Sequence, residues 1–221
     1  MTEEDGTSGE SRLAARPIEA SAPEEFGLVQ AWWGDGKGKT TAALGMAFRA
    51  AGHGYRVHVL QFLKGGTATV EDVRGEYNAM AAVPGISYEN TGHYGWHGFL
   101  DGTDDDEHEA KARAALARAR DLLDSAREAS LGEPIPLDSP PEAGVHMLVL
   151  DEVLYAVDHG LLSSAEVLRL IDEKPANLEL VCTGSHSRPD YLEDHAHLIS
   201  AVRKEKHPLE GGHAARKGTE Y

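Results

Sequence analysis

Two patterns of hydrophobic and polar positions alternate along the chain. Short apolar runs that stop at glycines or carboxylates are typical of buried strands. Six segments share this pattern and are predicted to be strands: 26–33, 56–62, 85–90, 145–152, 178–184 and 196–202. The clearest of them read "FGLVQAWW", "VHMLVLDE" and "LELVCTG", with few polar residues before the end of the run.

The second pattern, with apolar residues three and four positions apart, predicts amphipathic helices at 39–52, 104–130 and 163–175. Ser163 is a suitable N-cap for the last of these, and Pro175 a suitable stop. Strands that alternate with helices in this way indicate an α/β fold, a mostly parallel sheet with helices on both faces. Binding groups are then expected at the carboxyl ends of the strands.

The chain is expected to form one domain. Residues 1–25 are polar, rich in acidic residues and without periodicity, so they are predicted to be a flexible acidic N-terminal arm. Residues 26–221 are long enough to bury one complete core. Within them, the segment of about 131–145 contains four prolines and is predicted to be a surface insertion.

The composition narrows the function classes. A net charge of −16, with only 8 lysines among 21 basic residues, disfavours nonspecific binding of nucleic acid. No apolar run approaches the roughly 18 residues of a membrane span, and the N-terminus lacks the apolar core of a signal peptide. A single cysteine excludes an internal disulfide and a cysteine-based zinc site. We therefore expect a cytoplasmic protein.

The glycine-rich stretch "GDGKGKTT" lies between a predicted strand and a predicted helix, which is the setting of a phosphate-binding loop. Its glycines let backbone N–H groups approach an anion, its lysine supplies a charge, and its threonines offer a hydroxyl to phosphate or metal. The predicted binding residues are Gly34, Asp35, Gly36, Lys37, Gly38, Lys39, Thr40 and Thr41. Trp33 occupies the position where the usual pattern has its first glycine.

Two carboxylates, Asp151 and Glu152, end the strand predicted at 145–152. Sheets that bind nucleotides carry such a carboxylate for Mg²⁺ or its water shell. With Thr40 and Thr41 they form the predicted metal site, for Mg²⁺ with Mn²⁺ as an alternative. The loop and the carboxylates together predict binding of MgATP or MgGTP, and leave the reaction open.

Several segments together resemble the ATP:corrinoid adenosyltransferases of the P-loop type. They are "GDGKGKTTAALGMAFRAAGHGYRVHVLQFLKG", "LVLDEV", "LELVCTG", "KHP" and the C-terminal "ARKGTEY". The family also has a residue other than glycine at the first position of its loop. The resemblance covers nearly all of residues 27–221 except the proline-rich insertion. The fold class is then α/β and P-loop NTPase-like (RecA-like).

The resemblance implies an unusual use of ATP. Members of the family transfer the 5′-deoxyadenosyl group of ATP to Co(I) of a corrinoid, cob(I)alamin or cob(I)yrinic acid a,c-diamide, and release triphosphate, in cobalamin biosynthesis or salvage. They hold the nucleotide in reversed orientation. By this resemblance Lys39, Thr40 and Glu152 are the catalytic residues, with Lys39 stabilising the leaving group. The family also suggests a homodimer and a flavoprotein that supplies electrons.

Two further sites follow only from the resemblance. The family has an aromatic-X-Trp segment that packs against the corrinoid, and "HYGWHGF" offers Tyr94 and Trp96 at that spacing; ordinary packing aromatics are the alternative. The family also has an arginine near the nucleotide where this chain has Ser185. Arg188, three residues later, is a candidate to replace it.

Other functions share the same loop. A P-loop ATPase or small-molecule kinase would use Lys39 and the Asp151–Glu152 pair as well. A nucleotide-dependent binding module would keep ATP affinity without any transfer.

An acid-rich, lysine-poor surface also resembles proteins of salt-loving organisms, because salt screens the repulsion between like charges. We therefore expect molar salt to raise the free energy of unfolding above its value in dilute buffer. Urea denaturation at the two salt concentrations measures this, and equal stability in both would refute the halophile-like character.

Overall fold

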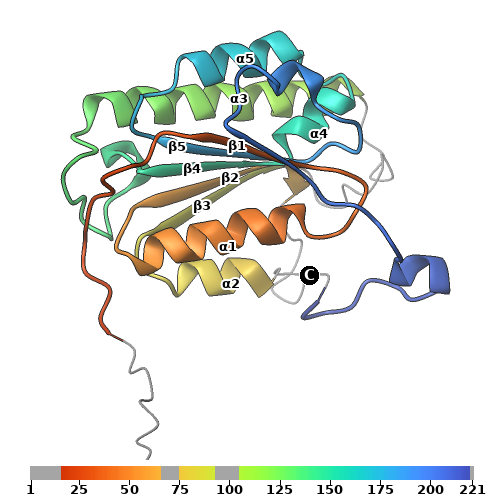
Figure 1. The fold of residues 1–221 in the computed structure, drawn as a ribbon, viewed down its shortest axis with the longest axis horizontal. Helices are drawn as coiled ribbons and strands as arrows, with labels where there is room; N and C mark the ends of the chain where they lie inside the picture. Colours follow the sequence, from red (N-terminus) through yellow and green to blue (C-terminus); the bar gives the residue numbers. More distant parts are fainter. Residues whose placement is uncertain (1–15, 66–74, 93–104, 220–221) are drawn as a thin grey trace, which may run out of the picture.

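The computed structural model describes residues 16–65, 75–92 and 105–219, and contains one six-stranded sheet (Figure 1). The strands are β1 (Val29–Trp33), β2 (Val57–Gly65), β3 (Ile86–Gly92), β4 (Met147–Asp151), β5 (Glu179–Thr183) and β6 (Leu198–Ala201). Their order is β3-β2-β4-β5-β1-β6, and each strand pairing in the described residues is parallel. The predicted parallel sheet is confirmed.

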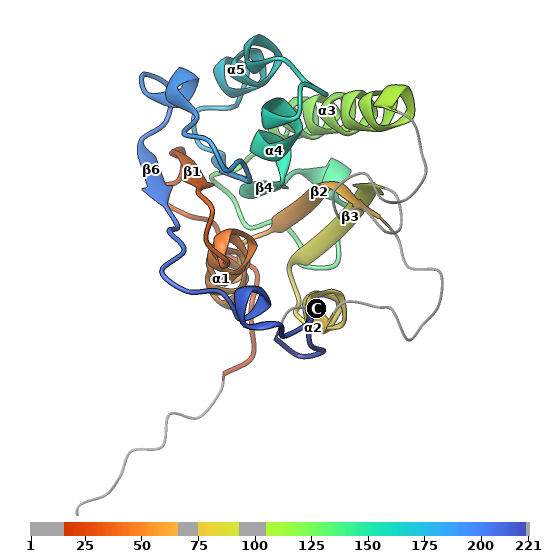
Figure 2. The ribbon, with the colours of Figure 1, turned by 90° about the vertical axis from the view of Figure 1, so that its right-hand side faces the viewer.

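Helices cover both faces of this sheet, as the alternating pattern predicted. They are α1 (Lys39–Gly52), α2 (Gly75–Ala81), α3 (Asp105–Glu128), α4 (Val153–Asp158) and α5 (Ser164–Asp172). In Figures 1 and 2, α1 and α2 lie on one face, and α3, α4 and α5 lie on the other. Short 3₁₀ helices follow at Pro141–Ala143, Asp190–Leu192 and Pro208–Gly211. Among the described helices, none combines the length and apolar composition needed to cross a membrane.

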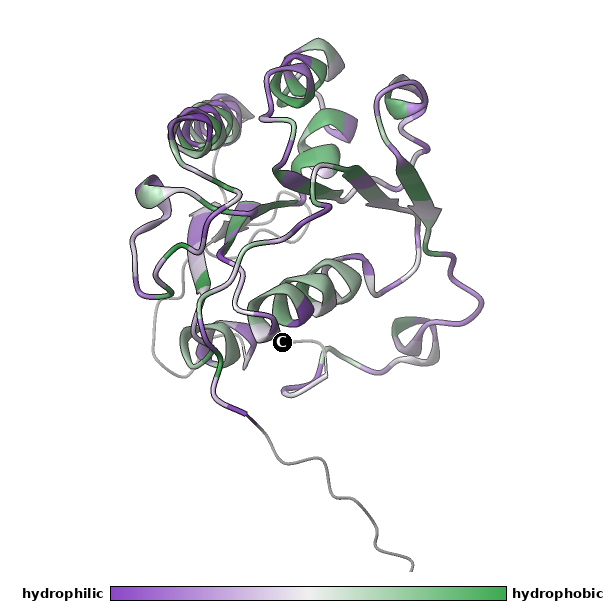
Figure 3. Ribbon diagram, turned by 60° about the vertical axis from the view of Figure 1, so that its left-hand side comes forward, coloured by the Kyte–Doolittle hydropathy of each residue, from purple (hydrophilic) through white to green (hydrophobic). Residues whose placement is uncertain are grey.

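The core consists of two apolar layers, one on each side of the sheet (Figure 3). Every residue of the central strands β4 and β5 is buried, which explains their nearly continuous apolar sequence. The alanine-rich face of α3 packs on one side, with Ala115, Leu116 and Leu122 buried. Burial on both faces holds the carboxyl ends of the strands in fixed positions.

Local signals predicted some helix boundaries well and others not. Ser163 caps α5 as expected: its side chain accepts the Glu166 N–H at 3.3 Å, and a Glu166 carboxylate oxygen accepts the Ser163 N–H at 2.8 Å. Helices α2 and α4 were not predicted. Six-residue α4 directly follows β4, so the apolar run of the strand continues into the helix and hides the boundary.

The described part of the N-terminal segment lies against the end of α1. Ser21 donates its N–H to the Gly54 carbonyl at 3.0 Å. Gly54 has φ +81, and a Cβ there would lie 1.8 Å from the Glu19 carbonyl oxygen. Glycine is therefore required at the point where the segment crosses the turn after α1.

A buried arginine fastens the proline-rich insertion to the sheet. Arg56, just before β2, is only 1% exposed, and its guanidinium donates to the carbonyls of Leu137 at 2.8 Å and Ser139 at 2.5 Å. Burial lowers the pKa of Arg56, while Asp138 raises it. The insertion thus contributes backbone carbonyls to a buried charge.

Replacing this arginine should loosen the insertion. We expect Arg56→Met to lower the free energy of unfolding by about 2–4 kcal/mol, because two carbonyls lose a charged donor. Urea denaturation measures the change. Arg49→Met is the matched control, since Arg49 is exposed on α1 and its loss should change stability by less than about 0.5 kcal/mol. Equal effects of the two substitutions would contradict the role of Arg56.

Candidate active site

The glycine-rich loop lies between β1 and α1 and is tied to the segments that follow β5 and β6. Gly34 donates its N–H to the Ser185 carbonyl at 3.0 Å, and Gly36 donates its N–H to the Val202 carbonyl at 2.8 Å. These two N–H groups therefore hold the loop to the neighbouring chain. Contacts within the protein thus shape the loop.

Two of the loop glycines are needed for packing. A Cβ at Gly34 would lie 2.3 Å from the Val202 carbonyl oxygen, and a Cβ at Gly36 would lie 2.7 Å from the carbonyl carbon of Arg203. A Cβ at Gly38 would make only an ordinary contact, 3.9 Å from Val202 Cγ1, but Gly38 has a φ of +127, which L-residues rarely adopt. The sequence predicts that all three glycines let the backbone turn sharply and bring its N–H groups close to an anion. The structure gives each of them a requirement in the backbone.

The N-terminus of α1 is suited to an anion. Gly38 provides no capping side chain, and the first turn contains no acidic residue, so no carboxylate of the helix itself offsets the positive end of its dipole. The Lys39 ammonium donates to the carbonyls of Gly34 at 2.7 Å and Gly36 at 3.0 Å. These bonds keep the charge at the loop, beside the helix N-terminus.

The other two polar residues of the loop hold the C-terminal segment. The Asp35 carboxylate accepts the Lys204 N–H at 3.1 Å, and this hydrogen bond lowers the pKa of Asp35. The Lys37 ammonium donates to the Thr219 carbonyl at 2.8 Å. Residues 202–219 are thereby attached to the loop at both of their ends.

The Asp151 carboxylate lies at the end of β4, with no exposed surface. One oxygen, Oδ1, accepts the hydroxyls of Thr40 at 2.9 Å and Thr183 at 2.6 Å. The other, Oδ2, accepts the Gln61 amide at 2.8 Å. Burying a carboxylate is tolerated only where donors replace its lost water, and these three side chains do so.

The bond from Thr40 to Asp151 decides what the hydroxyl can offer a ligand. A threonine hydroxyl has one proton, and here that proton points to Asp151. The oxygen then presents only lone pairs to anything else, which suits a cation and not a phosphate oxygen. A threonine oxygen beside a carboxylate fits Mg²⁺, which favours oxygen ligands and retains water. Thr41, the second candidate, is exposed on α1.

Glu152 has an unusual backbone conformation. It adopts φ +67 and ψ +12 at the start of α4, and its N–H donates to the Thr183 hydroxyl at 3.0 Å. Gly184 is close to it: a Cβ on Gly184 would lie 2.7 Å from the Tyr155 nitrogen and 3.2 Å from the Glu152 Cα. The Thr183 hydroxyl thus donates a hydrogen bond to the Asp151 carboxylate and accepts one from the Glu152 N–H, which holds both residues in place.

Comparison with known proteins identifies what this site belongs to. The family model for the ATP:corrinoid adenosyltransferases BtuR/CobO/CobP matches residues 25–221. A corrinoid adenosyltransferase of Pseudomonas aeruginosa is 34% identical over 204 residues, which is 91% of this chain and 87% of the relative. The corrinoid adenosyltransferases of Escherichia coli K12 and Salmonella typhimurium are each 31% identical to this chain. Each match covers 91% of this chain and 89% of the relative.

The chain belongs to the ATP:corrinoid adenosyltransferase family. The resemblance read from the sequence is confirmed, and so is the P-loop NTPase-like fold class, which the parallel sheet and the loop after β1 carry.

The structure brings most of the predicted site residues together. The loop from Gly34 to Lys39 lies beside Thr40, and Thr40 joins the loop to Asp151. Tyr94 and Trp96 lie outside the described residues, so their contact with a corrinoid stays a prediction.

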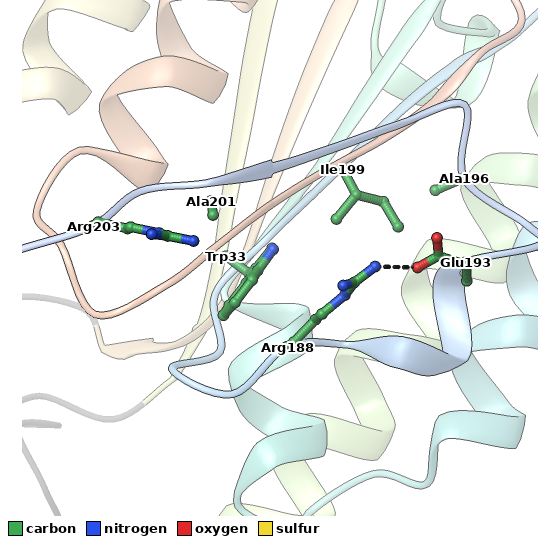
Figure 4. Close-up of a pocket in the computed structure, with 7 residues that line it drawn as sticks. All are labelled: Trp33, Arg188, Glu193, Ala196, Ile199, Ala201 and Arg203. Atoms are coloured by element: carbon green, nitrogen blue, oxygen red, sulfur yellow. Dashed lines mark hydrogen bonds and ion pairs between the residues drawn. The ribbon is translucent and has the colours of Figure 1, made fainter.

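Arg188 lines a cavity of about 420 Å³ beside Trp33, Ile199 and Arg203 (Figure 4). Its guanidinium pairs with Asp190 at 3.0 Å and with Glu193. The side chain of Trp32 packs against the apolar cluster on the α1 side of the sheet. Because successive side chains of a strand point to opposite faces, Trp33 and the cavity lie on the other face of β1. The described contacts of Arg188 are thus with its own loop, and its part in nucleotide binding stays a prediction.

Ser185, which stands where the family has an arginine, is 4% exposed and has φ +63. Its carbonyl accepts the Gly34 N–H, and its hydroxyl donates to the Ser187 carbonyl. The residue therefore supports the phosphate loop through its backbone.

One residue of the site was missed. Gln61 interrupts the apolar run of β2, and it is fully buried against Asp151. A polar residue among the apolar positions near the carboxyl end of a buried strand is the signal for such a position.

The packing of the loop predicts opposite effects for two glycines. Gly36→Ala should lower the free energy of unfolding by about 1–3 kcal/mol, because its Cβ meets backbone that cannot rotate away. Gly45→Ala, in α1 with nothing within 4 Å of the new Cβ, should raise it by about 0.5–1 kcal/mol. Urea denaturation measures both. Stabilisation by Gly36→Ala would show that the contact with Arg203 is not a constraint.

Proposed function

We propose that this chain transfers the 5′-deoxyadenosyl group of ATP to Co(I) of a corrinoid and releases triphosphate. The observation that carries the proposal is the family match over residues 25–221, in a chain whose phosphate loop and buried Asp151 meet through Thr40. In the reaction the cobalt electron pair forms the bond to C5′, and the C5′–O bond pair leaves with the triphosphate. No phosphoryl group moves and no water has to be positioned.

The chain's residues suit the stabilisation of a departing triphosphate. The Lys39 ammonium and the N-terminus of α1 supply positive charge where the leaving oxygens would lie. Both are held in place by the fold, so little reorganisation is needed as charge develops. Lys39 would exchange its bonds with the Gly34 and Gly36 carbonyls for bonds to phosphate oxygens.

A divalent cation, Mg²⁺ or Mn²⁺, would neutralise part of the triphosphate charge. Thr40 and Asp151 are the residues best placed to hold it, directly or through water, because the Thr40 hydroxyl donates its hydrogen bond to Asp151 and turns its lone pairs to the metal. Glu152 follows directly and would serve the same cation. Tyr94 and Trp96 would face the corrinoid, where an apolar wall keeps a lower ligand from the cobalt.

The proposal also includes finer expectations that the family suggests. The chain would act as a homodimer in the cytoplasm, with a flavoprotein as the source of electrons, and would need neither nucleic acid nor a membrane. A P-loop ATPase or kinase is not favoured, since the family to which the chain belongs is one of adenosyltransferases.

The direct test is anaerobic mixing of the chain with reduced cob(I)alamin and MgATP. We expect the corrinoid spectrum to change to that of the adenosyl form, with one triphosphate released for each corrinoid converted. Release of ADP and phosphate with an unchanged corrinoid would refute the proposal.

Lys39 tests the leaving-group role in the same assay. Lys39→Ala should lower the transfer rate by about 100- to 1000-fold, the cost of removing one group that stabilises developing charge. Its unfolding free energy should change by only about 1 kcal/mol, since the Lys39 bonds to the Gly34 and Gly36 carbonyls lie within the loop. Lys111→Ala, in α3, is the control and should leave the rate unchanged. A Lys39→Ala rate near that of the unchanged chain would contradict the role.

A further inference from the structure

Three polar side chains stand in line across adjacent strands at the edge of the candidate site. Gln61 in β2 is paired in register with Asn90 in β3 on one side and with Asp151 in β4 on the other. Gln61 is fully buried. A buried amide costs free energy unless its donors and acceptors are used, so its hydrogen bonds are informative.

The hydrogen bonds of Gln61 have a fixed direction. Its Nε2 donates to Asp151 Oδ2 at 2.8 Å, and its Oε1 accepts the hydroxyls of Tyr77 at 2.8 Å and Tyr88 at 3.2 Å. Asn90 Nδ2 donates to the Tyr77 oxygen at 3.0 Å, which leaves the Tyr77 proton for Gln61. An inverted amide would place an oxygen against the Asp151 carboxylate and face two hydroxyls with donors.

This direction determines the orientation of the Asp151 carboxylate. The Gln61 bond to Oδ2 opposes rotation of the carboxylate and, together with the two hydroxyls, keeps Oδ1 on the side of Thr40 and Thr183. If Oδ1 moved, the Thr40 proton would be free to turn toward a ligand, and its lone pairs would turn away. The amide therefore controls a hydroxyl that it does not touch.

We propose that Gln61 is a positioning residue for the metal of the bound nucleotide: it locks the Asp151 carboxylate, so that the Thr40 hydroxyl presents its lone pairs to the cation. Tyr77 and Asn90 act one step further away, by holding the Gln61 amide in the required direction. The inference deepens the proposed function and rests on its use of MgATP.

The measurement that isolates this role is the preference for MgATP over metal-free ATP. Calorimetry gives the two dissociation constants, with EDTA present in the metal-free titration. The ratio is the dissociation constant for metal-free ATP divided by that for MgATP. For Gln61→Leu we expect the ratio to fall by about 10- to 100-fold, the usual effect of removing a residue that orients a metal ligand. Binding of metal-free ATP should change little, because Lys39 and the α1 N-terminus are untouched. Gln61→Glu, which sets a second carboxylate against Asp151, should lower the ratio further.

Gln30 provides a matched control. It lies in β1 of the same sheet, and its amide donates to the Glu179 carboxylate in β5, which is 4% exposed. Gln30→Leu and Gln30→Glu make the same chemical changes beside a different buried carboxylate. The MgATP preference of the Gln30 variants should equal that of the chain without substitutions. If the preference fell equally in the Gln30 and Gln61 variants, the cause would be a general disturbance of the sheet, and the inference would be overturned.

A double-mutant cycle tests whether Gln61 acts through Thr40. If it does, Gln61→Leu should have little further effect on the ratio in a Thr40→Val background, whereas independent roles would give additive losses. Additive losses would overturn the inference. Tyr77→Phe removes a single hydroxyl and should lower the ratio in the same direction by a smaller factor, which keeps the test valid if Gln61→Leu fails to fold.

The outcomes separate this inference from the proposed function. A chain that adenosylates cob(I)alamin, while Gln61→Leu keeps its full MgATP preference, retains the function and loses the positioning role. A chain that leaves the corrinoid unchanged, while Gln61→Leu loses the preference, retains the positioning role as part of another MgATP-dependent reaction. If the chain without substitutions bound MgATP no more tightly than metal-free ATP, the inference would be overturned as well.

Discussion

The buried Asp151 carboxylate constrains how the elements around the site are arranged. A carboxylate removed from water needs donors, and its donors come from three separate elements: Thr40 from α1, Gln61 from β2 and Thr183 from β5. They can meet only if β2 and β5 flank β4 in parallel and α1 starts at the same edge of the sheet. The strand order and register provide this arrangement. The demand of one charge is therefore met by the arrangement of the whole sheet.

The phosphate loop is preorganised in a comparable way. Its Gly34 and Gly36 N–H groups bond to the segments after β5 and β6, and the missing Cβ atoms allow Val202 and Arg203 to lie against it. The Lys39 ammonium is held by the loop carbonyls, next to the N-terminus of α1. Contacts within the protein thus fix positive charge in place, which is the condition under which electrostatic stabilisation of a leaving group is most effective.

The sequence predicted what depends on burial and on local chemistry. The central strands β4 and β5 were recognisable because strands covered on both faces must be apolar, and the cap of α5 because Ser163 and Glu166 are three residues apart. Helix α2 was missed because Met80 is its only buried residue and leaves no periodicity. Gln61 was missed because its partner Asp151 is 90 residues away, and Arg188 was selected by nearness in sequence, although its described partners are Asp190 and Glu193.

The tryptophan at the first Walker position follows from the same geometry. Trp33 is the last residue of β1; its carbonyl accepts the Val202 N–H at 2.7 Å, and its side chain faces the cavity with Arg188 and Arg203 (Figure 4). A residue that is still paired in the sheet cannot also begin a wrap around phosphates. The turn therefore starts one residue later, at Gly34, and spans a shorter path to Lys39. A shorter loop that binds through its lysine and helix N-terminus suits an enzyme that holds triphosphate as a leaving group, since no attack on phosphorus has to be aligned.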